Sequence, residues 1–397
     1  MTRILTSLDQ IQRRARDLLP PAVYHYVEGG KEGERTVAAN ARAFDRVLFS
    51  PKVAAGVTDP VVATTVLGRE IAMPVIIAPT GYVRIVHPDG ELAAARAAAR
   101  AGIPIAISTL SAEPVDAVTA ANSEAWFQLY MIGGREGARF SMDRAREAGC
   151  RVLIVTVDVA AVTPHDRSSR RIPARLTPAS ALGLLPEIWN RPRWLLSLLR
   201  GGLVMSAPNA PLKADGSAMV LQEAGRLLTA APPNWEDLAW IRSQWDGPMV
   251  VKGVLRIDDA MRAIDIGADA ISVSNHGGKV LDGTPAALSV LPEIVDAVDG
   301  RLEVLLDGGV RRGADVVRAC ALGAKAVLIG RAYLWGLACR GESGVSEVLD
   351  LFRWSMTATL SQLGCPSIAA VDRSWLRPLP EPHDWNDFGV ESEACAR

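Results

Sequence analysis

The stretch at residues 270–283 holds the residue types with the clearest chemical potential. Ala270–Ser274 is a short, almost continuous apolar run, typical of a strand buried on both faces of a parallel sheet. It ends in a polar turn that carries His276 beside Gly277 and Gly278. Catalytic groups of α/β barrels lie at the carboxyl ends of such strands, and glycines let the backbone approach a flat ligand. His276 is therefore a candidate catalytic base, although a single loop histidine is more often a surface or capping residue.

A polar or glycine-rich tip follows each of eight short apolar runs. Because the carboxyl ends of parallel strands meet at one rim of a barrel, we expect these tips to form one shared site. They are Thr80, Ser108, Gln128 with Tyr130, Thr156 with Asp158, Lys252, Asn275 with His276, Asp307 to Gly309, and Gly330 with Arg331.

Two of these tips suggest a phosphate site. The seventh run ends in Asp307-Gly308-Gly309 and the eighth in Gly330-Arg331. Barrels bind phosphate at this place on backbone N–H groups and a helix N-terminus. The guanidinium groups of Arg311 and Arg331 suit phosphate as well. The alternative is two ordinary barrel turns with surface arginines.

The elements that must position these tips recur regularly from residue 71 onward. Alanine-rich helical stretches separate most of the apolar runs, and several end at a glycine, as C-terminal capping predicts. Eight strands, each followed by a crossover, predict an α/β fold of the (β/α)8 TIM barrel class. A doubly wound open sheet would normally show a glycine-rich turn after its first strand, and Ala78-Pro79-Thr80-Gly81 lacks that fingerprint. The expected strands are 75–78, 104–108, 126–130, 152–157, 249–252, 270–274, 304–307 and 326–330, and the expected helices include 91–101, 143–148, 258–266, 286–298 and 313–322.

Residues 1–70 form an N-terminal helical extension in this interpretation. Ser7 is a candidate cap for a helix that Pro20-Pro21 stops, and helical patterns resume at 23–27 and 32–44. The barrel is assigned to residues 71–370, and residues 371–397 are a C-terminal tail.

One long insertion interrupts the repeat between the fourth and fifth strands. Residues 172–247 are rich in proline and include a stretch at 182–199 rich in leucine and tryptophan. A structureless loop of this length inside a compact domain is unusual, so a function is expected. It could be an apolar lid, a segment that contacts a membrane or another subunit, or a helix pair packed on the barrel. Membrane contact through 182–199 is not favoured.

The composition excludes several classes of protein. The net charge of −1 gives no bulk electrostatic case for nucleic acid or an anionic membrane. Five cysteines without a Cys-x-x-Cys pair favour a reducing compartment over a disulfide frame or a zinc site. The first residues are too polar for a secretory signal, and no run reaches the length of a membrane-spanning helix. We expect a cytoplasmic protein with no metal site.

The motifs together resemble a known family, the FMN-dependent α-hydroxy acid oxidases and dehydrogenases. This family includes glycolate oxidase, L-lactate dehydrogenase and mandelate dehydrogenase. The likeness covers residues 8–370, approximately the whole chain. It is carried by residues 78–80, 127–130, 156–158, 251–253, 274–278 and 281–283 and by the two phosphate turns.

The resemblance implies that FMN lies across the barrel mouth. Lys252 would place a positive charge near N1 and O2 of the flavin, where negative charge develops on reduction. His276 would take a proton from the substrate, Asp158 would orient His276, and Tyr130 and Tyr26 would hydrogen-bond the substrate. The isoalloxazine would be lined by Pro79, Thr80, Ser108, Gln128 and Thr156, with Ser274 as a further cofactor contact, and the ribityl phosphate would be held by Asp307, Gly309, Arg311, Gly330 and Arg331.

The chain departs from the family at the two arginines that normally clamp the substrate carboxylate. His165 and Lys279 occupy these positions, and neither offers the planar bidentate fork of arginine. Arg167 could restore one contact if the loop is displaced by two residues. These changes favour a bulky, hydrophobic substrate over glycolate or lactate.

The leading hypothesis is an FMN enzyme that oxidises a carbon bearing OH or NH2 next to a carbonyl. The segments 234–240, 281–287 and 330–337 resemble the branch that contains the mycofactocin-maturation flavoprotein, which implies oxidative deamination of a peptide-derived lactam as an alternative. Tyr26 fits the hydroxy-acid branch better. An FMN-dependent isomerase and a non-enzymatic flavin-binding protein are further alternatives. The electron acceptor could be O2, a quinone or a redox protein, and the family implies a homotetramer.

Overall fold

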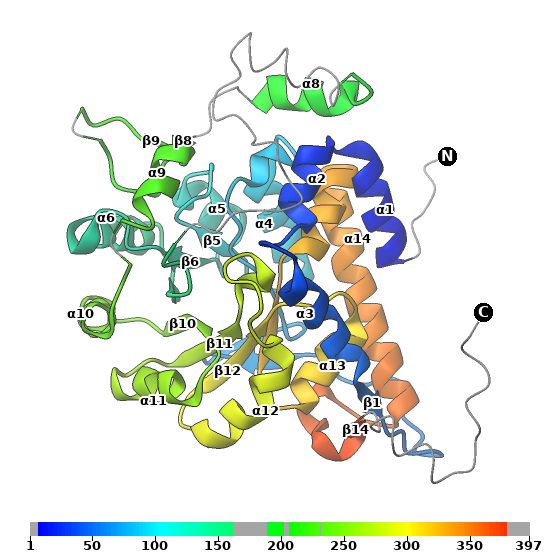
Figure 1. Ribbon diagram of the computed structural model, residues 1–397. Coiled ribbons are helices and arrows are strands. Elements are labelled where there is room, and N and C mark those ends of the chain that lie inside the picture. The colour runs from blue at the N-terminus through cyan, green and yellow to red at the C-terminus, as the bar shows by residue number, and fades with distance from the viewer. Residues whose placement is uncertain (1–6, 162–188, 202–205, 214, 231, 379–397) are drawn as a thin grey trace.

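The computed structural model describes residues 7–161, 189–201, 206–213, 215–230 and 232–378. Eight parallel strands form one sheet in the order β4-β13-β12-β11-β10-β7-β6-β5, and a parallel bridge between Ile77 and Ile105 joins its two ends. Helices surround the sheet (Figure 1). The predicted (β/α)8 barrel is confirmed. Its strands are β4 (Val75–Ile77), β5 (Ala106–Ser108), β6 (Trp126–Leu129), β7 (Leu153–Thr156), β10 (Met249–Val254), β11 (Ala270–Ser274), β12 (Glu303–Asp307) and β13 (Ala326–Ile329).

The barrel interior changes from apolar to polar along the strands. Successive strand residues point to opposite faces, so residues two apart share the interior. At mid-height the interior is an apolar cluster that the hairpin of β2 (Thr64–Val66) and β3 (Arg69–Ile71) closes at its amino-terminal end. Two residues further along the same faces stand Ser108, Gln128, Thr156, Lys252 and Asp307, all buried. The strands therefore bring polar side chains together at one rim.

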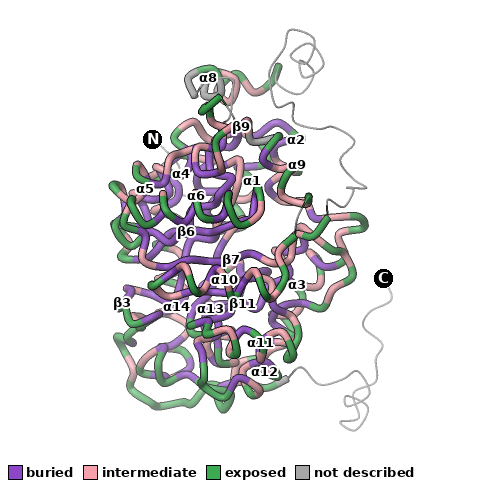
Figure 2. Tube along the Cα trace, turned by 90° about the vertical axis from the view of Figure 1, so that its left-hand side faces the viewer, coloured by how far each residue is buried: buried purple, intermediate pink, exposed green. Residues whose placement is uncertain are grey.

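The outer helices mostly follow the expected stretches. They are α4 (Gly90–Ala101), α5 (Val115–Ala121), α6 (Gly134–Glu147), α10 (Trp235–Gln244), α11 (Ile257–Asp265), α12 (Ala287–Val298), α13 (Gly313–Ala321) and α14 (Arg331–Leu363). Buried residues lie on the central strands and inner helix faces, and exposed residues lie on the outer turns (Figure 2). Helix α6 starts nine residues before the expected 143–148, and α5 is a crossover that the sequence analysis did not name.

The N-terminal extension packs against the barrel. Helix α1 (Leu8–Leu18) is capped by Ser7, whose hydroxyl accepts from the Gln10 N–H at 3.3 Å, and it packs along α14. Helix α2 (Pro21–Glu28) follows, and α3 (Arg35–Asp45) packs on α12 and on the turn that contains His276. Strand β1 (Val47–Phe49) pairs with β14 (Leu376–Pro378), so the described start of the expected C-terminal tail joins the extension.

The described parts of the insertion include ordinary barrel structure. Helix α10 is the crossover between β7 and β10, although it falls within the 172–247 range expected for the insertion. A short hairpin, β8 (Ser206–Ala207) with β9 (Met219–Val220), precedes α9 (Leu221–Leu227). Helix α8 (Pro192–Gly201) lies outside the barrel near α2, and its Trp194 indole donates to Ile85 O at 2.8 Å (Figure 1). In the described part of the chain, none of the helices has the length and apolarity needed to cross a membrane.

Candidate active site

A pocket opens at the polar rim of the barrel. It is bounded by the ends of the strands and by four residues of the extension, Tyr26, Val27, Val37 and Asn40. The sequence-predicted residues that line it are Tyr26, Pro79, Thr80, Ser108, Tyr130, Lys252, His276, Lys279, Asp307, Gly309, Arg311, Gly330 and Arg331.

Four of the remaining predicted residues stand beside the pocket. Gln128, Asp158 and Ser274 each hydrogen-bond a side chain that lines it. Thr156 is the register partner of Lys252 on the adjacent strand. His165 and Arg167 lie outside the described residues.

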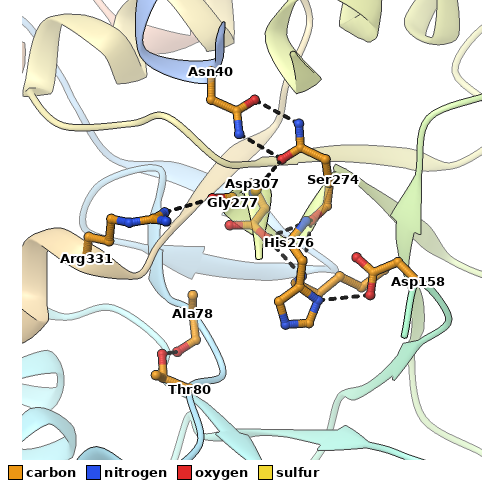
Figure 3. A network of polar contacts seen from close by, with 12 residues as sticks. Asn40, Ala78, Thr80, Asp158, Ser274, His276, Gly277, Asp307 and Arg331 are labelled. Carbon is orange, nitrogen blue, oxygen red and sulfur yellow. Dashed lines mark hydrogen bonds and ion pairs between the residues drawn. The ribbon is translucent and has the colours of Figure 1, made fainter. Parts of the chain in front are cut away.

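His276 and Asp158 form a directed pair. The imidazole Nδ1 lies 2.9 Å from Asp158 Oδ1, and the other ring nitrogen points away from Asp158 toward the space beside Thr80 (Figure 3). Burial alone would raise the pKa of Asp158, but the facing His276 and Lys252 charges lower it below its ordinary value. Asp158 is therefore an anion that can hold a proton on Nδ1 and leave Nε2 to accept one.

A glycine makes room for this aspartate. A Cβ at Gly253, whose φ is +115°, would lie 2.7 Å from Asp158 Cβ. The ladder between β10 and β11 shifts register between Lys252 and Val254, so Gly253 occupies a bulge. Bulges commonly re-aim side chains next to active sites.

Lys252 belongs to a buried three-residue network. Its Nζ lies 2.8 Å from Asp307 Oδ2 and 3.1 Å from Ser274 Oγ, and the Ser274 hydroxyl donates to the same carboxylate at 2.7 Å. Burial alone would lower the pKa of Lys252, but Asp307 and Asp158 raise it overall. Burial alone would raise the pKa of Asp307, but the Lys252 charge has the larger effect and lowers the pKa of that carboxyl below its ordinary value. Lys252 is thus a fixed positive charge in the pocket.

Unpaired polar atoms test whether the rim suits FMN. Gln128 Nε2 and Thr156 Oγ1 are buried and have no hydrogen-bond partner among the described residues. Leaving such groups unpaired costs about 1–3 kcal/mol each. A flat heteroaromatic ring with donors and acceptors on its edge would satisfy them, and Lys252 would oppose negative charge on that ring. The rim therefore fits an isoalloxazine.

The phosphate end also fits. A Cβ at Gly309, whose φ is +82°, would lie 2.4 Å from Asn40 O, so only glycine is accommodated in this turn. Helix α14 begins at Arg331 directly after Gly330. Arg331 donates to Glu28 O, Gly29 O and Gly277 O at 2.9–3.0 Å, and Arg311 donates to Glu28 Oε1 at 2.9 Å. Backbone N–H groups and two guanidinium groups thus meet where barrels bind phosphate.

Two tyrosines and a lysine border the rest of the pocket. The Tyr26 hydroxyl donates to Gly81 O at 2.9 Å. Burial raises the pKa of Tyr130, and the charge of Asp158 adds to this effect, so its hydroxyl stays protonated. Lys279 donates from Nζ to Tyr26 O at 2.7 Å and to Gly29 O at 3.0 Å. Its amino group is therefore engaged by the carboxyl end of α2, and burial together with the Arg331 charge lowers the pKa of Lys279 well below its ordinary value.

Glu91 is a buried acid outside this network. Its Oε1 accepts from the Ala112 N–H at 3.3 Å, and its Oε2 has no partner among the described residues. Burial raises the pKa of Glu91 to about 7. The carboxyl group therefore takes up a proton more readily in the folded chain than in the unfolded chain.

Sequence reasoning missed Asn40 and Tyr82, which also line the pocket. The only sequence signal for Asn40 was its spacing. It lies four residues after Thr36 on α3, and the side chains of Thr36 and Asn40 are both buried. From sequence alone, a polar residue in an amphipathic helix is predicted to face solvent, because its tertiary partners are not known.

Comparisons with known proteins agree with this geometry. The model of the family described as FMN-dependent dehydrogenase matches residues 15–378. The chain is 46% identical over 362 residues to pre-mycofactocin synthase of Mycolicibacterium smegmatis, covering 90% of each chain. It is 38% identical over 367 residues to 4-hydroxymandelate oxidase of Amycolatopsis orientalis, covering 92% of this chain and 97% of that protein.

A solved structure is similar across its full length. The monotopic membrane protein (S)-mandelate dehydrogenase superposes with a TM-score of 0.87 at 37% identity, covering 95% of this chain and 100% of the other. Fold, rim chemistry and sequence thus agree with the resemblance noted above. The chain belongs to the FMN-dependent dehydrogenase family and is an FMN-dependent oxidoreductase of the 2-hydroxy acid oxidase and dehydrogenase type.

Proposed function

We propose that the enzyme oxidises a carbon bearing OH or NH2 next to a carbonyl group in a bulky, hydrophobic substrate. The observation that carries this proposal is the His276–Asp158 pair, at 2.9 Å, at the edge of the pocket that Lys252 enters from the barrel interior. A base and a fixed cation in one pocket suit a two-electron oxidation, in which the base takes one proton and the second hydrogen leaves either as hydride with the electron pair or as a second proton. FMN held at this rim would supply the two-electron acceptor.

Each side chain at the pocket has a separate role in this proposal. His276 accepts the substrate proton at Nε2, and Asp158 stabilises the imidazolium that results. Tyr130 and Tyr26 orient the substrate by hydrogen bonds. Lys252 stabilises negative charge at the cofactor end of the pocket.

We assign the cofactor contacts to residues already at the rim. Gln128 and Thr156 offer the unpaired atoms described above, and Ser108 donates to Gln128 Oε1 at 2.9 Å, which leaves Gln128 Nε2 available. The other contacts in this assignment are Pro79, Thr80, Ser274, Asp307, Gly309, Arg311, Gly330 and Arg331.

One observation favours the second candidate, oxidative deamination at an amine carbon of a peptide-derived lactam. Lys279 stands where an arginine would clamp a carboxylate, yet its Nζ is engaged by Tyr26 O and Gly29 O. Moving Nζ to a substrate carboxylate would leave these carbonyls without that donor, which costs about 1–3 kcal/mol if they are buried. A substrate without a carboxylate avoids this cost. The similarity to pre-mycofactocin synthase supports the same candidate.

Anaerobic bleaching of the flavin tests the substrate proposal. The panel pairs (S)-mandelate with (S)-2-hydroxy-2-phenylacetamide, in which a neutral carboxamide replaces the carboxylate next to the reacting carbon. It also includes lactate, glycolate and a cyclic 2-amino amide. We expect the bulky members to reduce the flavin faster than lactate or glycolate. Faster reduction by lactate would contradict a bulky substrate. Turnover with no change in redox state between substrate and product would instead support an isomerase.

We further propose a cytoplasmic homotetramer that passes electrons to O2, a quinone or a redox protein. Oxygen uptake compared with quinone or cytochrome reduction distinguishes the acceptors, and light scattering gives the assembly. Membrane contact has one supporting observation. Trp189, which precedes α8, is 80% exposed, and Leu196 and Leu199 on α8 are 56% and 53% exposed. Cosedimentation with anionic vesicles would contradict a purely cytoplasmic location.

A further inference from the structure

The turn that carries His276 is fastened to the N-terminal extension by a buried pair of amides. Asn40 on α3 donates from Nδ2 to Asn275 Oδ1 at 2.8 Å, and Asn275 donates from Nδ2 to Asn40 Oδ1 at 2.8 Å. In Figure 3 the Asn40 amide points toward the turn that carries His276, and dashed lines mark the two bonds that it makes there. They are only 2% and 5% exposed, so water does not replace these bonds.

Each amide also has other partners. Asn275 Nδ2 donates to Pro285 O at 3.0 Å, and Asn275 Oδ1 accepts from the Gly278 N–H at 3.2 Å. Asn40 Oδ1 accepts from the Ala287 N–H at 3.3 Å. The pair therefore connects α3, the His276 turn and the start of α12 in one network.

The turn needs such support because its backbone is strained. His276 has a φ of +56°, and Gly277 and Gly278 follow at +63° and +76°. A non-glycine residue in this region costs of order 1–3 kcal/mol and persists only where the surroundings enforce it. Two local bonds contribute, the His276 N–H to Ser274 Oγ at 3.0 Å and the cap that Asn275 provides.

We propose that Asn40 is a positioning residue for His276. By fixing both polar ends of the Asn275 amide, it holds the turn in the conformation that places Nδ1 of His276 against Asp158. Loss of the Asn40 side chain leaves a buried donor and acceptor of Asn275 short of a partner, and the turn can then relax toward ordinary backbone angles. This inference rests on the proposed role of His276 as the base.

Truncation at Asn40 keeps its backbone contact with Gly309 of the neighbouring cofactor turn and removes the side-chain Nδ2 that lies beside Gly308, 3.3 Å from where a Cβ would stand. The atom of Asn40 that a Cβ at Gly309 would meet at 2.4 Å is the backbone oxygen, which remains in any substitution. Asn40→Ala removes the amide completely. Asn40→Asp keeps the acceptor for Asn275 Nδ2 and sets a second acceptor oxygen against Asn275 Oδ1 in place of the donor, so it breaks one of the two bonds without opening a cavity and serves if the alanine variant fails to fold.

A second buried asparagine gives the matched control. Asn122 is 4% exposed, donates from Nδ2 to Ile103 O at 3.1 Å and accepts from the Glu124 N–H at 3.0 Å. It lies after α5, at the opposite end of the barrel from the pocket. Asn122→Ala should cost comparable stability without touching His276.

The experiment measures flavin reduction in the FMN-loaded protein under anaerobic conditions, as a function of substrate concentration and pH. For Asn40→Ala we expect the limiting rate to fall about tenfold or more, the substrate dissociation constant to stay within about threefold, and the acidic limb of the pH–rate profile to move. Asn122→Ala should match the wild type in all three. A wild-type rate and pH profile in both Asn40 variants would overturn the proposal, as would a loss confined to FMN content and thermal stability.

A crystal structure of Asn40→Ala separates this inference from the proposed function. We expect φ of His276 to leave the left-handed region or Nδ1 to move beyond hydrogen-bond distance of Asp158. An unchanged turn contradicts the inference whatever the substrate is. A wild-type flavin that no member of the substrate panel reduces contradicts the proposed function alone.

Discussion

Replacing Asp158 with asparagine removes the negative charge opposite His276 and keeps the shape of the side chain. The two groups are 2.9 Å apart, and their side chains are 12% and 23% exposed. A hydrogen bond to a charged group contributes about 1.5–3 kcal/mol. If this energy stabilises the imidazolium as it takes the substrate proton, its loss slows flavin reduction by about 10- to 150-fold.

The pH dependence of Asp158→Asn follows from the lowered pKa of Asp158. Because the His276 and Lys252 charges hold that pKa below its ordinary value, the wild-type carboxylate is charged throughout the range from about pH 5 to 9. The variant should therefore be slower than the wild type by a similar factor across this range, and anaerobic stopped-flow reduction at saturating substrate measures the limiting rate at each pH.

The matched control is Asp258→Asn, an Asp-to-Asn change at the start of α11, where Asp258 pairs with Arg256 on the exposed surface. It should leave the limiting rate unchanged. A wild-type limiting rate across this pH range in Asp158→Asn would refute the role of the carboxylate. A loss found only in substrate affinity would refute it too, because Asp158 is argued to act on the proton transfer.

Three further predictions concern the pocket and its surroundings. Lys252→Met should slow flavin reduction by about 10²–10³-fold. It should also lower the free energy of unfolding by about 3–5 kcal/mol in denaturant titrations, because Asp307 then stays buried without its cation. The wild type should lose stability as pH rises from 5 to 8, because the pKa of Glu91 is raised to about 7 in the folded chain. Glu91→Gln should therefore become more stable relative to the wild type across this window, by at most about 3 kcal/mol. A difference in thermal midpoint that does not change with pH would contradict this prediction. Tyr130→Phe should weaken substrate binding by about 2- to 12-fold in flavin absorbance titrations, the energy of one hydrogen bond, and unaltered binding would exclude the contact.

The barrel could be predicted from the sequence because its strands are buried on both faces. Continuous apolar runs such as Ala270–Ser274 have few alternative interpretations when helical stretches separate them at regular intervals. The start of α6 could not be predicted. Gly134 and Gly137 disfavour a helix locally. A Cβ at Gly137 would lie 2.6 Å from Pro211 Cγ, so a contact with a distant segment requires the glycine that helix propensity disfavours.

The shared polar rim was predictable for a related reason. Alternation along a strand places Ser108, Gln128 and Lys252 on the interior face, and parallel strands end at the same rim. The pairing within the rim was not predictable. Lys252 contacts Asp307 and Ser274 because of the register between three strands, and the periodicity of the sequence does not determine that register.

Contacts between distant segments explain the other misses. Asn40 and Asn275 are separated by 235 positions, and the local sequence around either residue does not indicate that the other is its hydrogen-bond partner. The partners of Lys279 are backbone carbonyls, which carry no sequence signal at all. The predictions for His165 and Arg167 fall outside the described residues and stay predictions.

The central claim is that His276 is the base that serves a flavin bound at this rim. The most direct measurement compares wild type with His276→Ala for FMN content and for anaerobic flavin reduction by the best substrate of the panel. The account predicts that both proteins bind FMN and that the variant loses reduction by about 10²-fold or more. Reduction of the variant at the wild-type rate, or a wild-type protein that takes up no FMN, would contradict it.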